Sequence, residues 1–212
     1  AGAAALPVST TGVGQTARLN FTGALGQNLG FGLTGITLTP TNTNPVSVVV
    51  YKPDGSYLTQ VGCYTNAPAA CSLNMLNLPV AGVYSMVLTP PAGTTAFSGS
   101  VSLSADVTGS FTLGTTSAIT IARNGQNALY SFAGTAGQQL GLGLSAALTT
   151  PAAQIIYVTV FKPDGTTLGS TSINGGATAA VVYDVPALPV TGTYTVRINP
   201  ASAATASLNV LL

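Results

Sequence analysis

The chain contains the same sequence pattern twice, in the same order. The segment 26–33 reads GQNLGFGL and returns at 137–144 as GQQLGLGL, while 50–55 reads VYKPDG and returns at 160–165 as VFKPDG. A third pair follows, LPVAGVY at 78–84 and LPVTGTY at 188–194. A repeat of this length indicates two copies of one structural unit. We therefore predict a first domain at 1–107 and a second at 108–212.

Within each copy the apolar residues recur at every second position. Tyr84, Met86 and Leu88 alternate with smaller residues, and Tyr194 begins the equivalent alternation in the second copy. This period indicates half-buried strands, and the Lys-Pro-Asp-Gly segments between them suit tight turns. No stretch has an apolar face at helical spacing. The prediction is an all-β fold, with two tandem jelly-roll-like or Ig-like antiparallel β-sandwich domains of the same repeat.

Few side chains are charged, and this limits the partners of the chain. Charged residues make up 4% of the sequence and hydrophobic residues 46%, with a formal net charge of +1. An ordinary soluble domain has about 25% charged residues, so the surface here must be neutral and polar. The sequence has no basic patch for nucleic acid. Because no apolar run approaches the roughly 18 residues of a spanning helix, we expect no membrane insertion.

Two cysteines, Cys63 and Cys71, lie eight residues apart, and their spacing matches no common metal site. A local disulfide is the favoured interpretation, and two reduced core cysteines are the alternative. The second copy has Ile173 and Val181 at these positions, so the bridge is an addition to one copy. A disulfide persists in oxidising compartments, which favours a secreted protein at the cell surface. Residues 1–8 have no basic leader, as expected of a processed chain.

Two sets of residues are candidates for contacts between subunits. The first is the N-terminal segment 1–11, which we expect to link subunits; its contact residues are Ala3, Ala4, Ala5, Leu6 and Val8. The second is a set of glycines inside predicted strands, Gly30, Gly32, Gly141 and Gly143. Glycine in a strand marks either the close approach of another backbone or a bend or bulge, and both remain open. The N-terminal segment could equally dock on its own domain.

The combined motifs resemble a known family. The order of Gly-Gln-x-Ala, Phe-x-Gly-x-x-Gly-Gln, Lys-Pro-Asp-Gly-x-x-Leu and Leu-Pro-x-x-Gly-x-Tyr is similar to tandem repeats in large secreted bacterial surface proteins, and to bacterial pre-peptidase C-terminal-like domains. The resemblance covers about 12–107 and 118–212. It implies a jelly-roll-like sandwich that serves as a spacer, adhesive or stalk module. Some relatives are thought to bind calcium or carbohydrate, but acidic clusters are missing here.

The chain lacks the residues of common active sites. It has no histidine and no glutamate, so the usual general bases near neutral pH are absent. We expect no enzyme activity, no cofactor and no metal site. Tyr57 and Tyr64 are the exposed aromatic candidates for a sugar ligand, although the chain has no tryptophan.

These observations favour an extracellular structural or adhesive surface protein, a subunit of a homopolymeric filament or stalk. Its partner would be itself, joined head to tail through β-strand contacts. The alternative is a carbohydrate-binding module of a larger secreted protein that recognises surface glycans. A phage or virion decoration protein is a third interpretation.

Overall fold

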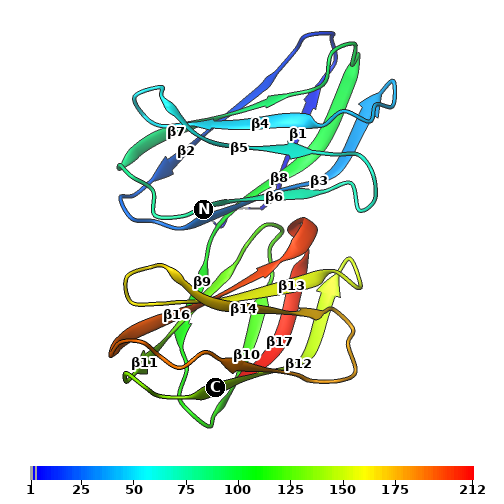
Figure 1. The fold of residues 1–212 in the computed structure, drawn as a ribbon. Coiled ribbons are helices and arrows are strands. Elements are labelled where there is room, and N and C mark those ends of the chain that lie inside the picture. The colour runs from blue at the N-terminus through cyan, green and yellow to red at the C-terminus, as the bar shows by residue number, and fades with distance from the viewer. Residues whose placement is uncertain (1, 3) are drawn as a thin grey trace. The chain divides into compact units, whose positions relative to one another are not determined.

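The computed structural model describes residue 2 and residues 4–212, and most of them belong to strands, which turns and short loops connect (Figure 1). A short 3-10 turn, η1 (Ala201–Ala203), is the only helical element among the described residues. The all-β prediction is confirmed. None of the described residues forms a helix long and apolar enough to cross a membrane.

The chain divides into two compact units, Ala1–Ala105 and Asp106–Leu212. The boundary lies two residues before the predicted one, because the residues after Ala105 pair with the second unit. The backbone N–H of Val107 donates to the carbonyl of Asn127 at 2.8 Å. Residues 106 and 107 therefore belong to the second unit.

The first unit has two four-stranded antiparallel sheets. One has the order β1 (Leu6–Thr10), β8 (Ala96–Ala105), β3 (Leu29–Thr39), β6 (Cys71–Met75). The other has the order β2 (Ala17–Gly23), β7 (Gly82–Thr89), β4 (Val46–Tyr51), β5 (Tyr57–Cys63). Each sheet contributes to a single apolar core.

The second unit repeats this order and adds one strand. Its first sheet runs β10 (Thr116–Ile121), β17 (Thr205–Leu211), β12 (Leu140–Thr150), β15 (Val181–Val185). Its second sheet runs β14 (Thr167–Asn174), β13 (Ile155–Phe161), β16 (Gly192–Pro200), β11 (Ala128–Gly134), β9 (Val107–Ser110). The added strand, β9, pairs in parallel with β11, whereas the other pairings are antiparallel.

A buried tyrosine occupies the same place in both cores, as the period of two predicts. Tyr84 and Tyr194 are fully buried. Each hydroxyl donates to the carbonyl four residues earlier, Val80 at 2.6 Å and Val190 at 2.7 Å. A tyrosine that bonds back to the upstream backbone fixes the entry to a strand in many β-sandwiches. The two copies thus share their core chemistry as well as their strand order.

Candidate functional site

An apolar groove opens along one edge of the first unit. It has a volume of about 230 Å³ and lies where β2 and β7 of one sheet meet β1 and β8 of the other. Its lining residues are mostly apolar: Ala4, Leu6, Leu19, Asn20, Phe21, Met86, Val101 and Leu103. Pockets for drug-sized ligands usually measure about 300–1,000 Å³, so the groove is small for such a molecule.

The equivalent edge of the second unit is covered. There β9 pairs with β11, and the next residue, Phe111, enters the core with 7% of its surface exposed. The ring of Phe111 stacks on Tyr130 with a centroid distance of 5.0 Å. Tyr130 corresponds to Leu19, because Phe132 pairs with Tyr194 as Phe21 pairs with Tyr84. The strand β9 and Phe111 therefore occupy the place that is a groove in the first unit.

The exposure of matching side chains shows the same difference. Phe132 is 4% exposed in the second unit, while its counterpart Phe21 is only half-buried. Leu212 is 7% exposed, while its counterpart Leu103 is half-buried. The rings of Phe21 and Tyr84 still stack, with a centroid distance of 5.2 Å, as Phe132 and Tyr194 do at 5.4 Å. The core of the first unit is formed, but one side of it is open.

The backbone of β2 also lacks a neighbour on its outer side within residue 2 and residues 4–212. In the second unit, the carbonyl of Ser131 accepts a 2.8 Å hydrogen bond from the N–H of Phe111. Since backbone groups alternate in direction along a strand, Leu129 faces β9 as well. The counterparts of Ser131 and Leu129 are Asn20 and Arg18. Their backbone groups face the open edge.

The structure places the predicted N-terminal contact residues on their own unit. Strand β1 pairs with β8, so Leu6 lies opposite Val101, and Val8 is buried with 8% of its surface exposed. Ala4 and Ala5 are exposed, and Ala3 lies outside the described residues. Intramolecular docking, the alternative that the sequence left open, is what the structure contains. The role of these residues between subunits stays a prediction.

The four strand glycines occupy different environments in the two units. Gly30 and Gly32 are buried in β3, whereas Gly141 is exposed in β12 and an added Cβ there would meet no atom within 4 Å. An added Cβ at Gly143 would lie 3.7 Å from the Cβ of Leu211. The register shifts of β3 and β12 come later, after Thr34 and after Ser145. These glycines therefore do not mark the bulge itself.

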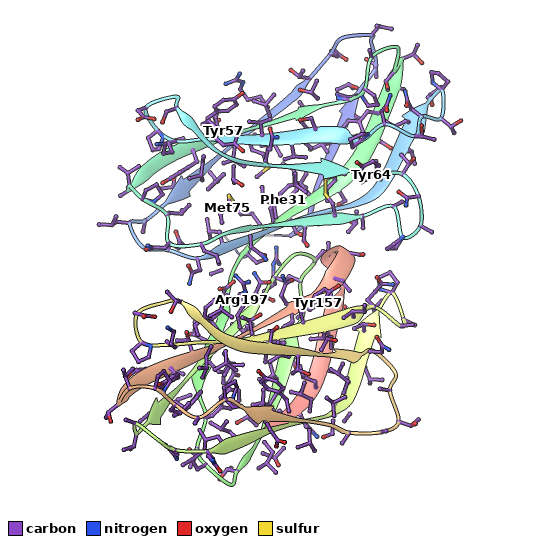
Figure 2. The ribbon with its side chains drawn as sticks, in the orientation of Figure 1. Phe31, Tyr57, Tyr64, Met75, Tyr157 and Arg197 are labelled. Carbon is purple, nitrogen blue, oxygen red and sulfur yellow. A yellow bond between two sulfur atoms is a disulfide. The ribbon has the colours of Figure 1, made fainter. Side chains whose placement is uncertain are left out.

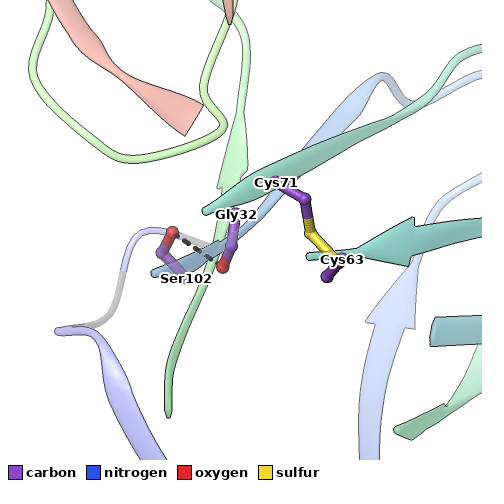
Figure 3. The surroundings of a disulfide bond; sticks show 4 residues. All are labelled: Gly32, Cys63, Cys71 and Ser102. Atoms are coloured by element: carbon purple, nitrogen blue, oxygen red, sulfur yellow. Dashed lines mark hydrogen bonds between the residues drawn. A yellow bond between two sulfur atoms is a disulfide. The ribbon is translucent and has the colours of Figure 1, made fainter. Parts of the chain in front are cut away.

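A disulfide joins Cys63 at the end of β5 to Cys71 at the start of β6 (Figure 3). Their Cα atoms are 5.2 Å apart. Because β5 and β6 belong to different sheets, the bond connects the two layers of the first unit. Nearby in β8, the hydroxyl of Ser102 donates to the carbonyl of Gly32 at 3.5 Å. Neither cysteine lines the groove.

The two candidate sugar-binding tyrosines do not form one platform. Tyr57 is 55% exposed and Tyr64 is 50% exposed, so both are accessible. They lie at opposite ends of β5 (Figure 2). Seven residues of extended chain separate them by about 23 Å, which is more than two sugar rings stacked side by side would span.

Sequence reasoning missed a polar hollow on the outer face of the second unit. It measures about 600 Å³ and is lined by Tyr157, Thr159, Ser170, Thr171, Ser172, Arg197 and Asn199. Figure 2 labels Tyr157, which is 48% exposed, and Arg197. The guanidinium of Arg197 lies 5.3 Å from the ring centroid of Phe161. The alternation along β13 and β16 turns these residues outward, but sequence alone does not show that β13, β14 and β16 adjoin.

Electrostatic effects on Arg197 and Asp106 oppose one another. Burial lowers the pKa of Arg197, and the charge of Asp106 raises it again. Burial also raises the pKa of Asp106, while the amide of Asn127 at 3.3 Å and the charge of Arg197 lower it. Burial is the larger effect on the pKa of both residues.

Two of the other three aspartates, Asp54 and Asp164, lie in turns. Asp54 accepts a 2.6 Å hydrogen bond from the hydroxyl of Ser56, and Asp164 accepts one of the same length from Thr166. These bonds hold the pKa of both carboxyl groups below the ordinary value. The residues that the structure describes contain no group of three or more His, Cys, Asp or Glu arranged to hold a metal ion.

Comparisons with known proteins give no family. No family model and no curated protein matches the chain. Among solved structures, the CUB1-EGF-CUB2 domains of human MASP-1/3 align over 97% of this chain and 99% of theirs, at 11% identity and a TM-score of 0.26. The ANXUR2 extracellular domain from Arabidopsis thaliana aligns over 97% and 83%, at 10% identity and a TM-score of 0.29. Tripeptidyl peptidase 2 aligns over 95% and 22%, at 11% identity and a TM-score of 0.31. At such TM-scores we draw no argument from these likenesses.

Proposed function

We propose that the chain is an extracellular structural protein made of two tandem jelly-roll-like β-sandwich modules, and a subunit of a homopolymeric filament or stalk. The observation that carries this proposal is the open edge of β2 beside an apolar groove. An unpaired strand with exposed apolar side chains is a template for pairing with another chain. Such pairing is a recurrent way for β-proteins to join.

Two further observations support the proposal. Strand β1 pairs with β8 in the first module and β10 pairs with β17 in the second, and apart from the added β9 the strand order of the sheets is the same in both, as in an eight-stranded jelly roll. The Cys63–Cys71 disulfide and a surface with few charges suit a protein outside the cell. The described residues also offer no histidine or glutamate for catalysis.

The direct test is the state of the purified chain over a range of concentrations, measured by sedimentation velocity and electron microscopy. We expect regular elongated assemblies that grow with concentration. Deletion of residues 1–9 is an unsuitable control, because it removes most of β1 and with it Val8 from the core.

The better control is Arg18→Pro. Arg18 is exposed and its backbone N–H faces the open edge, where a proline is tolerated but cannot pair with an added strand. A dispersed monomer at every concentration would contradict the filament.

The polar hollow of the second unit supports one other candidate function, carbohydrate binding. Tyr157 offers a ring for stacking, and Arg197 and Asn199 offer hydrogen bonds to hydroxyl groups. A glycan screen tests this function. Binding that Tyr157→Ala abolishes, in a chain that stays monomeric, would favour it over the structural role.

A further inference from the structure

We infer that the polar hollow of the second unit binds an acidic sugar, with Tyr157 against the sugar ring and Arg197 on its negatively charged group. The inference goes beyond the structural role and deepens the second candidate function, carbohydrate binding, on which it rests for the nature of the ring. The hollow measures about 600 Å³, a volume typical of ligand pockets. Its lining residues all belong to β13, β14 and β16.

The strand register makes Tyr157 and Arg197 diagonal neighbours on the outer face of the sheet. Tyr157 of β13 pairs with Asn199 of β16, and Thr159 pairs with Arg197. Diagonal neighbours on one face of an antiparallel pair are about 7–8 Å apart. A sugar ring that stacks on Tyr157 can therefore present a charged substituent to Arg197.

Hydroxyl groups line the other side of the hollow. On β14, Ser172 pairs with Tyr157 and Ser170 pairs with Thr159. A side-chain hydroxyl both donates and accepts hydrogen bonds, which suits the hydroxyls of a sugar. Among the described residues that line the hollow, only Arg197 is charged. The lining therefore favours a ligand that combines hydroxyl groups with a negative charge.

The guanidinium of Arg197 is held in place, but no direct contact neutralises its charge. The ring of Phe161 positions it, with 5.3 Å between the guanidinium carbon and the ring centroid. No described carboxylate forms an ion pair with Arg197, and its buried Nε atom has no hydrogen-bond partner among the described residues. Burial lowers the pKa of Arg197, and the charge of Asp106 offsets this only in part. A bound anion would compensate for the lost solvation.

The first unit forms the same sheet without these side chains, so the fold does not require them. Strand β4 pairs with β7 in the same register as β13 pairs with β16. Ser47 and Val87 occupy the positions of Tyr157 and Arg197. The first unit thus has neither the aromatic ring nor the positive charge at this place. Ligand binding explains why the second copy has both, whereas folding does not.

Titration of the full chain with an oligomer of galacturonic acid tests the inference. We expect saturable binding by isothermal titration calorimetry, with NMR shifts centred on the amides of Tyr157, Thr159 and Arg197. The methyl ester of the same oligomer is the matched control, because it keeps the rings and loses the charge. The ester should bind at least about tenfold more weakly, since hydrogen bonds to charged groups are the stronger ones. A sulfated galactose oligomer tests the other source of negative charge, and binding of either acidic oligomer supports the inference.

Two variants of the chain introduce the residues of the first copy. Arg197→Val should weaken binding of the acidic oligomer at least about tenfold and remove the preference for the acid over its ester. Tyr157→Ser should weaken binding of both oligomers about fivefold, because the stacked ring is lost. Tyr157 is 48% exposed, so this variant keeps the core intact. Lys52→Gln removes one positive charge from the turn after β4 of the first unit and should leave the affinity unchanged.

The outcomes separate the inference from the structural role. Binding of an acidic oligomer that Arg197→Val weakens and Lys52→Gln does not supports the inference, whether the chain assembles or stays monomeric. Assembly of a chain that binds neither acidic oligomer keeps the structural role and overturns the inference. Equal affinity for the acid and its ester, equal loss of binding with Lys52→Gln, or NMR shifts centred on the first unit also overturns it.

Discussion

The ring of Phe111 stacks on the ring of Tyr130 with a centroid distance of 5.0 Å, and this contact closes one edge of the second core. No described residue makes an equivalent contact with Leu19, the counterpart of Tyr130, in the first unit. The same strand order therefore exists in a closed and an open form within one chain.

Removing the closing ring should open the second unit. We expect Phe111→Ala to lower its free energy of unfolding by about 3 kcal/mol, since a buried phenylalanine is lost. Denaturant unfolding followed by tyrosine fluorescence measures the change. The matched control is Leu113→Ala, which removes a 49% exposed side chain two residues later and should change little. Equal effects would show that Phe111 contributes no specific packing.

The tyrosine hydroxyls should stabilise both units. We expect Tyr84→Phe and Tyr194→Phe each to lower the free energy of unfolding by about 1 kcal/mol, because each leaves a carbonyl without its donor. Tyr157→Phe, at an exposed position, is the control. Thermal unfolding of the three variants provides the comparison. A variant as stable as the natural chain would mean that water replaces the bond.

Loss of the disulfide should weaken only the first unit. The bond closes a loop with a separation of eight residues, and loop entropy assigns it about 2.5 kcal/mol. We expect Cys63→Ala with Cys71→Ala to lower the stability of residues 1–105 by this amount. Hydrogen exchange resolves the two units. Equal loss of protection in the second unit would contradict the account.

The two turn aspartates make stability depend on acid pH. Hydrogen bonds from Ser56 and Thr166 lower the pKa of Asp54 and Asp164 from the ordinary 3.8. A carboxyl group whose pKa is lower in the folded chain than in the unfolded chain stabilises the fold at pH values above its unfolded pKa. This stability is lost as the pH falls through the folded pKa.

The combined variant Asp54→Asn with Asp164→Asn should therefore lose less stability than the natural chain between about pH 6 and about pH 2. Denaturant unfolding at the two pH values measures this difference. If the variant and the natural chain lose the same amount of stability between these two pH values, the turns contribute nothing to the acid sensitivity.

Local patterns in the sequence were enough to predict the strands and the core. Alternation at Tyr84 and Tyr194 predicted their burial, and the Lys-Pro-Asp-Gly segments predicted turns. The distance of eight residues favoured the disulfide between Cys63 and Cys71, which the structure contains. Each of these features depends on neighbours close in the sequence or on the period of the strand.

Local sequence patterns could not predict the groove, because the groove depends on which strands lie at a sheet edge. The sequence repeat placed the domain boundary after residue 107, whereas Val107 to Ser110 form one strand beside β11 in the second unit. Only the three-dimensional pairing shows that β9 lies beside β11, whereas β2 has a single neighbouring strand, β7, among the described residues.

Amide hydrogen exchange at two equivalent pairs of residues tests the central claim most directly. In the dispersed chain, the amides of Arg18 and Asn20 should exchange rapidly, and those of Leu129 and Ser131 slowly, because only the second pair faces a bound strand. Equal protection of both pairs would contradict an open edge in the first unit.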